Sequence, residues 1–262
     1  MFGSTVKPCA RPTVRGYVIV ALCALLCAGC AAEEKEKPAG ASSTASSGAP
    51  TPTRSARPQG GLMNDADIRE TVRRGLEAAG DPYTGDLTHK SASMLKEVAV
   101  PLPKTWRFFR FDAFPHPQAS FHVAVEVSTG KVVFLTGRPA AFGQVLAASK
   151  ATLQTTRDAV AVARAYLDVT RRMDRYLRVV DGIEDLAWRP EPTAEEKKAR
   201  ERAEPRLRSL LKPPAAVVKG DTYVVTLFVR NGTDIEQRTV TIDAGASVTE
   251  TRKVMLQGLP LA

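Results

Sequence analysis

Cysteine is missing from most of this chain. All four cysteines among its 262 residues, Cys9, Cys23, Cys27 and Cys30, lie at the N-terminal end. Residues 31–262 therefore contain no thiol for a disulfide bond, a cysteine nucleophile or a thiolate metal site. The stability of this part must come from an ordinary hydrophobic core.

Histidine is also scarce. The chain has three histidines, His89, His116 and His122, and no H-E-x-x-H motif. A zinc site needs three or four ligands that converge on the metal. We therefore expect no metal site and no cofactor, with His116 in a loop and His122 on the outward face of a strand.

The sequence lacks the common catalytic motifs. It has neither a G-x-S-x-G nucleophile elbow nor a G-x-x-x-x-G-K phosphate loop. Two carboxylates that face each other can cleave a glycosidic bond, and Asp112 and Glu126 lie on neighbouring predicted strands. Exposed strand carboxylates are usually only solvated. We therefore expect no catalytic residues and no enzyme, with a hydrolase that uses Asp112 or Glu126 as the alternative.

No apolar run is long enough to span a membrane. The run from Tyr17 to Leu26 extends through Ala28 to ~12 residues, whereas a spanning helix needs about 20. Lys7, Arg11 and Arg15 precede this run. A basic segment, a short apolar run and small residues before a cleavage site are typical of a secretory signal peptide.

The end of this segment resembles the lipobox of bacterial lipoproteins. The matching residues are Ala28, Gly29 and Cys30, while Cys27 stands where lipoboxes have leucine and Leu26 lies one position earlier. The resemblance implies that the signal peptide is removed before Cys30 and that Cys30 is acylated. Two or more acyl chains anchor a protein stably to a membrane. The alternative is an ordinary secreted protein cut near the same place.

The expected mature protein begins with a lipidated tether. Removal of the signal peptide, residues 1–29, leaves 30–62, where a charged cluster at 33–37 precedes a stretch rich in Ala, Ser, Thr and Pro. Such a segment cannot bury enough apolar surface to fold, and as a flexible linker it reaches on the order of 30 Å. Ala31, rather than Asp, follows Cys30, which resembles an outer-membrane sorting signal. We expect an exported protein anchored at the outer membrane, or at the plasma membrane in a Gram-positive cell.

The net charge is moderately positive. The chain carries a formal charge of +9, and removal of the three basic residues before Cys30 leaves +6. Positive charge attracts anionic lipids or nucleic acid, but an exported protein rarely meets nucleic acid. The expected partners are therefore the membrane, through the lipid on Cys30, and an envelope protein, with no nucleic acid.

The folded part is predicted to be α+β, with two repeated units that each pack a helix on an antiparallel β-meander. The first unit is 63–145, and its helix begins at Asn64 or Asp65. Its apolar face at helical spacing consists of Ile68, Val72, Leu76 and Ala79. Alternating apolar residues and turn residues predict four strands, at 95–100, 105–111, 121–127 and 132–135.

The second unit is 150–262. Apolar residues three and four positions apart predict a helix over 157–177. The pattern that follows predicts strands at 222–229, 238–243 and 247–255. Within the same unit, about 185–214 is predicted to be a charged helical insertion.

Glycines mark the predicted hairpin turns. Asn231-Gly232 is a strong turn signal between two strands. Gly130 and Gly245 stand at the corresponding turns of the two meanders, where a tight turn requires positive φ. We expect both glycines to adopt that conformation.

This helix-then-meander pattern is similar to that of PepSY-type modules, and a cystatin-like shape has the same pattern. In the second unit the matching residues are Ala159, Ala163, Tyr223, Val225, Ile242, Asp243 and Gly245. In the first unit Gly130 and the strands beside it match. PepSY-type modules resemble inhibitory or assembly domains, some of them carried by protease propeptides. The resemblance therefore implies protein binding rather than catalysis.

An aromatic strand supplies the first candidate interaction surface. Trp106, Phe108 and Phe114 are expected on one face of it, and Phe109 and Phe111 on the other. One face can pack on the helix of the first unit. The other is either open to a partner, since aromatic residues often anchor interfaces, or buried between the two units.

The charged insertion supplies the second candidate surface. Thr193 is expected to cap its helix in a capping box with Glu196, Glu196 to pair with Arg200, and Pro205 to break or kink the helix. The basic cluster consists of Lys197, Lys198, Arg200, Arg202, Arg206 and Arg208. It could contact anionic lipid or peptidoglycan, or could simply be a solvated charged face.

These patterns together favour a non-catalytic, envelope-anchored lipoprotein that binds or assists another envelope or cell-surface protein. Two alternatives remain. One is the envelope hydrolase described above, and the other is a lipoprotein effector or accessory factor that acts between bacterial cells.

Overall fold

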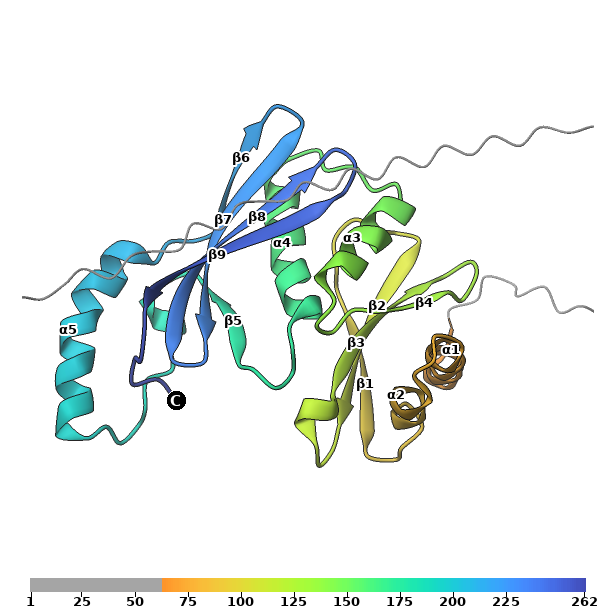
Figure 1. Ribbon diagram of the computed structural model, residues 1–262, viewed down its shortest axis with the longest axis horizontal. Helices are drawn as coiled ribbons and strands as arrows, with labels where there is room; N and C mark the ends of the chain where they lie inside the picture. Colours follow the sequence, from red (N-terminus) through yellow and green to blue (C-terminus); the bar gives the residue numbers. More distant parts are fainter. Residues whose placement is uncertain (1–62) are drawn as a thin grey trace, which may run out of the picture. The chain divides into compact units, whose positions relative to one another are not determined.

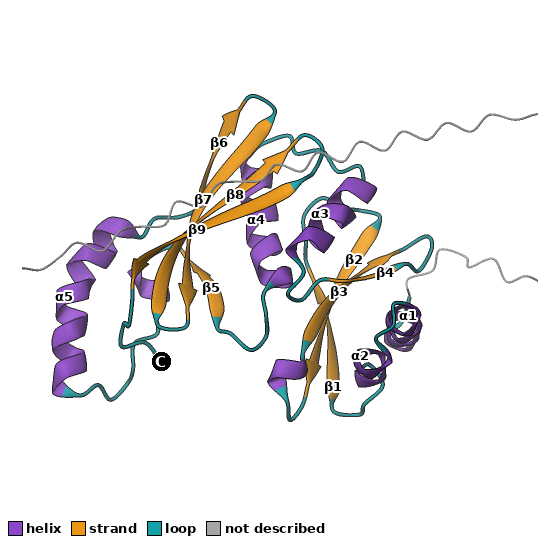
Figure 2. Cartoon of the chain, viewed as in Figure 1, coloured by secondary structure: helices purple, strands orange, loops and turns teal. Residues whose placement is uncertain are grey.

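The computed structural model describes residues 63–262, which form an α+β structure with five α-helices and two antiparallel sheets (Figures 1 and 2). These residues all belong to one compact unit. None of the helices in this part is both long and apolar enough to cross a membrane. The predicted signal peptide, the lipidated Cys30 and the tether lie outside the described residues.

The first sheet is a plain meander in the order β1-β2-β3-β4. Its strands are β1 (Ser93–Val98), β2 (Trp106–Ala113), β3 (Phe121–Glu126) and β4 (Val132–Phe134). Helix α1 (Asp65–Ala78) precedes it, and the Asn64 side chain accepts a hydrogen bond from the Asp67 amide at 2.9 Å, as a cap should. These strands and this helix agree with the sequence prediction to within a few residues.

One face of the first sheet packs under α1. Ile68, Val72 and Leu76 of α1 are buried in a core with Phe109 and Phe111 of β2. The short helix α2 (Pro82–Leu87) follows α1 and adds Leu87 to the same core. The apolar face of α1 thus packs on the apolar face of the first sheet, as the sequence predicts.

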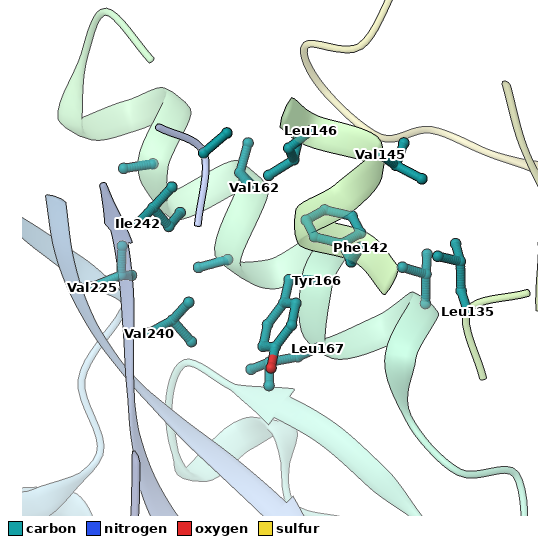
Figure 3. Packing of buried hydrophobic residues seen from close by; sticks show 14 of the residues in the cluster. Leu135, Phe142, Val145, Leu146, Val162, Tyr166, Leu167, Val225, Val240 and Ile242 are labelled. Carbon is teal, nitrogen blue, oxygen red and sulfur yellow. The ribbon is translucent and has the colours of Figure 1, made fainter. Parts of the chain in front are cut away.

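The other face of the first sheet packs under α3 (Pro139–Ala148) and α4 (Thr156–Thr170). The same two helices also cover the second sheet, so one core joins both halves of the described chain. Figure 3 shows Tyr166 of α4 between Phe142 of α3 and the second-sheet residues Val225 and Val240. The ring centroids of Phe142 and Tyr166 lie 5.6 Å apart.

The second sheet has the order β5-β7-β8-β9, and β6 pairs with β7 on the same side as β5. Its strands are β5 (Leu177–Val180), β6 (Ala215–Lys219), β7 (Thr222–Asn231), β8 (Asp234–Asp243) and β9 (Val248–Leu256). Helix α5 (Ala194–Leu210) lies in the predicted insertion and buries Ala203 and Leu207 in a core with Phe228 and Ile235. Short 3-10 helices occupy Pro117–Ala119 and Ile183–Asp185.

The predicted helix over 157–177 is wrong at its C-terminal end. Helix α4 ends at Thr170, because Arg171 has an extended backbone and Leu177 already pairs with Asn231 in the second sheet. Tyr176, expected on the buried face of the helix, is 46% exposed. Pairing in the sheet therefore overrides the continuing helical pattern.

The turn predictions have mixed outcomes. Gly232 and Gly130 have φ of +62° and +72°, as expected for tight hairpin turns. The prediction for Gly245 is wrong, because Ala246 next to it takes the left-handed conformation with a φ of +63°. This turn is held instead by Asp243, whose carboxylate accepts a hydrogen bond from the Ser247 amide at 2.8 Å.

Candidate functional site

A mostly apolar hollow lies beside the β6–β7 hairpin. It has a volume of about 290 Å³, and we call it the hairpin pocket. Its lining residues come from the loop before β2, the end of α3, the α3–α4 loop, α4, the hairpin and the β8–β9 turn. They are Leu102, Leu146, Ala151, Thr152, Leu153, Val162, Val218, Gly220, Asp221, Tyr223, Ile242, Asp243, Ala244 and Ala246.

The pocket wall is mostly apolar. Ile242 and Val162 belong to the shared core and close the pocket from inside. Tyr223 of β7 lies half-buried at the wall, and its hydroxyl donates a hydrogen bond to the Leu153 carbonyl at 3.4 Å. This bond connects the hairpin to the α3–α4 loop across the pocket.

Backbone strain is concentrated at this pocket. Among the described residues, the non-glycine residues with positive φ are Leu102, Lys150 and Ala246, at +101°, +52° and +63°. Leu102 and Ala246 line the pocket, and Lys150 immediately precedes its Ala151. Such conformations cost of order 1–3 kcal/mol each and are concentrated at functional sites. The loops around the pocket are thus held in a shape that local preference disfavours.

The charged groups that line the pocket are two carboxylates. Asp221 and Asp243 bring carboxylates to its rim, and both residues are exposed. None of the residues that line it is a histidine, a cysteine or a lysine, and its side-chain hydroxyls belong to Thr152 and Tyr223. The pocket can therefore exclude water from an apolar group about the size of a side chain, and its rim disfavours an anion there.

The two carboxylates of the hydrolase hypothesis are not brought together. Glu126 pairs with Trp106, whereas Asp112 lies one residue beyond the Phe111–Phe121 pair. This places them six residues apart along the antiparallel strands, which is roughly 20 Å. Paired glycosidase carboxylates lie about 5–9.5 Å apart. The structure therefore contradicts a shared site for this pair.

Each of these carboxylates has a local partner instead. Asp112 forms an ion pair with Arg110 at 2.6 Å. Glu126 accepts a hydrogen bond from the Thr129 hydroxyl at 2.5 Å, within the turn that follows β3. Both interactions are typical of strand ends and turns.

His122 is buried rather than outward-facing. It is 0% exposed, because α4 packs against its face of β3. Neither ring nitrogen has a hydrogen-bond partner within the described chain. Burial, followed by the charges of Arg171 and Arg110, lowers the pKa of His122 to about 3, so the ring is neutral. Within 63–262, no three potential metal ligands are grouped around a common point.

The aromatic strand is buried on both faces. Trp106 is 5% exposed and Phe108 is 2% exposed, and both lie in the core beneath α3 and α4. Phe109 and Phe111 lie in the core beneath α1. Of the predicted aromatic surface, only Phe114 is accessible, at 55% exposure. Trp106 and Phe108 cannot serve as partner anchors, since the second layer of helices already covers them.

Helix α5 has the predicted capping box of Thr193 and Glu196. Its predicted ion pair is wrong, because Glu196 binds Arg189 while Arg200 binds Glu204 at 2.6 Å. The helix continues through Pro205. Pro205 lies on the exposed side, where water can satisfy the carbonyl that loses its partner.

The basic residues of α5 do not form one positive face. Lys197, Lys198, Arg202, Arg206 and Arg208 are exposed and Arg200 is half-buried. The guanidinium of Arg200 lies 4.8 Å above the Trp188 ring. Lys198, Arg202 and Arg206 are four positions apart and lie along one side of the helix. Arg200 and Arg208 lie on another side, where both pair with Glu204.

The sequence reasoning missed a buried ionic cluster. Arg238 of β8 is 7% exposed and lies between Glu236, at 2.5 Å, and Glu250. The Tyr166 hydroxyl is 3.2 Å from the Glu250 carboxylate, and burial, with Glu250, raises the pKa of Tyr166. The sequence does contain a signal for this cluster. Glu236 and Arg238 are four and two positions before buried Val240, so all three side chains lie on the same face of β8.

Comparisons with known proteins identify no relative. No protein-family model matches the chain, and no curated protein or solved structure gives a significant match.

Proposed function

We propose that this chain is a bacterial lipoprotein that is cleaved before Cys30 and acylated there. The segment up to residue 62 tethers the folded part to the membrane, with the outer membrane as the favoured location. The folded part binds another envelope protein and has no catalytic activity. The sequence pattern before Cys30 supports the anchor, and the polar composition of 31–62 supports the tether.

The hairpin pocket is the observation that carries the binding function. Ligand sites are typically concave, mostly apolar and equipped with a few polar groups. At about 290 Å³ the pocket is at the small end of that class, which suits one apolar side chain of a protein partner. Its wall is mostly apolar and contains no histidine, cysteine or lysine, which favours binding over turnover.

We also propose that the two halves, 63–145 and 150–262, are diverged copies of one PepSY-like or cystatin-like unit. Each half has a helix before its meander, α1 before the first sheet and α4 before the second. Both meanders turn through a left-handed residue, Gly130 in the first and Ala246 in the second. The second copy differs by its insertion at about 185–214, which contains α5.

The proposal is tested by crosslinking in cells, followed by mass spectrometry of the recovered complexes. The native chain is compared with Cys30→Ser, and both are grown with an alkyne-labelled palmitate. We expect label on the native chain alone, and recovery of one envelope protein that falls when the anchor is removed. Absence of label on the native chain would contradict the lipoprotein assignment.

The proposal that the protein has no catalytic activity needs its own measurement. The purified full chain in detergent is assayed for cleavage of peptide, glycan and ester substrates in the presence of a chelator. We expect no turnover above background. Reproducible turnover that survives the chelator would overturn the binding assignment.

A further inference from the structure

A second hollow extends along the neighbouring edge of the same sheet. It has a volume of about 560 Å³ and lies between α4 and the start of β6, and we call it the α4–β6 groove. It is lined by Thr156, Arg157, Val160, Ala161, Arg164, Pro214, Ala215 and Ala216. Ala216 lines this groove and Val218 lines the hairpin pocket. Because alternate residues of a strand share a face, one side of β6 connects the two hollows.

The outer edge of β6 is free. Within the described residues β6 pairs only with β7, and four of its five residues are exposed. Val217 and Val218 are 53% and 56% exposed. An apolar strand with an unpaired edge is a template for another strand, and proteins usually protect such edges. Here only Lys219, at the end of the strand, carries charge.

The groove is positive. Arg157 and Arg164 of α4 line it, and no acidic residue does. Arg157 is exposed, and no carboxylate in the described part lies within ion-pair distance of it. Arg164 binds Asp181 at 2.5 Å, outside the groove lining. An anionic side chain in the groove would therefore meet at least one uncompensated guanidinium.

We propose that an extended segment of the protein partner adds to the free edge of β6 as a further strand. Its alternate side chains then enter the two hollows on the α4 side: an apolar side chain in the hairpin pocket and an acidic side chain beside Arg157. Main-chain hydrogen bonds give affinity in this mode of recognition, and the side-chain pockets give specificity. This inference rests on the proposed binding function and names the chemistry of the partner.

The spacing follows from strand geometry. Side chains that share a face of a strand are two residues and about 6.8 Å apart. The pocket adjoins Val218 and the groove adjoins Ala216. The recognised segment therefore has an apolar residue with Asp or Glu two or four positions away. Asp221 and Asp243 at the pocket rim exclude an acidic residue from the apolar position.

The test is selection of nine-residue peptides from a random displayed library on the immobilised full chain in detergent. Selected peptides are then synthesised with a fluorescent label and titrated by anisotropy. We expect them to share an apolar residue with an acidic residue two or four positions away. Methylation of alternate backbone amides should weaken binding at least tenfold, because it removes the strand hydrogen bonds.

One pair of variants locates the site. Arg157→Glu should weaken binding at least tenfold, whereas Lys198→Glu on α5 should leave it unchanged. Arg157 lies in the first turn of α4, where an acidic residue favours the helix, so the variant should fold. Lys198 is likewise exposed on a helix, but away from both hollows.

Two results would overturn the inference. One is a selected set without acidic residues, and the other is binding that Arg157→Glu and backbone methylation leave intact. Failure here is distinguishable from failure of the proposed function. If crosslinking in cells still recovers an envelope protein that depends on the hairpin pocket, the binding function stands and only strand addition is wrong.

Discussion

Val217 and Val218 are adjacent in β6 and almost equally exposed, at 53% and 56%, but only Val218 lines the hairpin pocket. The alternation of the strand directs the two side chains to opposite faces. The two residues therefore form a matched pair for mutagenesis. They are adjacent in β6 and similarly exposed, but only Val218 reaches the pocket.

A tryptophan at position 218 should close the pocket. We expect Val218→Trp to reduce recovery of the crosslinked partner at least tenfold, and Val217→Trp to leave it within twofold of the native level. Quantitative mass spectrometry of the recovered complexes measures both, and thermal unfolding confirms that both variants fold. Equal losses for the two variants would show that the pocket is not the binding site.

Gly130 and Gly245 should respond differently to alanine. Gly130 has a φ of +72°, and an alanine there costs about 1 kcal/mol in the left-handed conformation. The Cβ itself would meet only Thr71, at an ordinary 3.5 Å. Gly245 does not have positive φ, and an added Cβ would lie 3.3 Å from Asp243 Oδ1, which must shift by a few tenths of an ångström. Gly245→Ala should therefore cost less than Gly130→Ala. Urea unfolding gives both values, and equal losses would contradict the assigned turn.

His122 should make stability depend on pH. Burial, with Arg171 and Arg110, lowers its pKa to about 3 in the folded protein, against about 6.5 unfolded. The unfolded state therefore binds more protons, and this stability is present above pH 6.5 and is lost as the pH falls toward 3. Relative to His122→Phe, the native protein should lose about 1 kcal/mol between pH 7 and 5.5.

Urea unfolding of both proteins at the two pH values measures this difference. The exposed loop residue His116 provides a substitution control, His116→Phe. A constant difference between native protein and His122→Phe across this range would contradict the burial of a neutral ring.

Arg238 should contribute strongly to stability. Arg238→Met leaves the buried carboxylate of Glu236 and the half-buried one of Glu250 without their guanidinium, and the loss of one partner in a buried pair typically costs 3–5 kcal/mol. Arg252 pairs with Arg238 across β8 and β9 but is exposed, so Arg252→Met should change stability by less than about 0.5 kcal/mol. Similar effects of the two variants on thermal unfolding would contradict the cluster.

The local elements of the fold were predictable because their signals are local. The cap at Asn64, the face formed by Ile68, Val72 and Leu76, and the Asn231-Gly232 turn all follow from neighbouring residues. The end of α4 was not predictable in this way. Its apolar spacing continues past Thr170, and only pairing between β5 and β7 stops the helix.

Burial of the outer strand faces was missed for a related reason. Alternation in β3 indicates that His122 faces away from Val123, and a single sheet covered by one helix would leave it exposed. The structure adds a second layer of helices on that side, which buries His122 and also Trp106 and Phe108. No short-range pattern in the sequence predicts this second layer of helices, α3 and α4.

The hairpin pocket could not be predicted from the sequence either. Its lining residues are scattered from Leu102 to Ala246, and most are ordinary apolar residues. Tyr223, Ile242 and Asp243, which carry part of the PepSY-type resemblance, do lie in this lining. The left-handed backbone of Leu102 could not be foreseen, since nothing about a leucine indicates positive φ.

The most direct test of the central claim uses a photo-crosslinking amino acid at position 218 of the full chain in its native cell. The same amino acid at position 217 provides the control on the opposite face of β6. The proposed function predicts one envelope protein attached through position 218, with little or none through 217, and its loss when Cys30 is changed to Ser. Equal attachment from both positions, or none from 218, would contradict a tethered protein that binds its partner through the hairpin pocket.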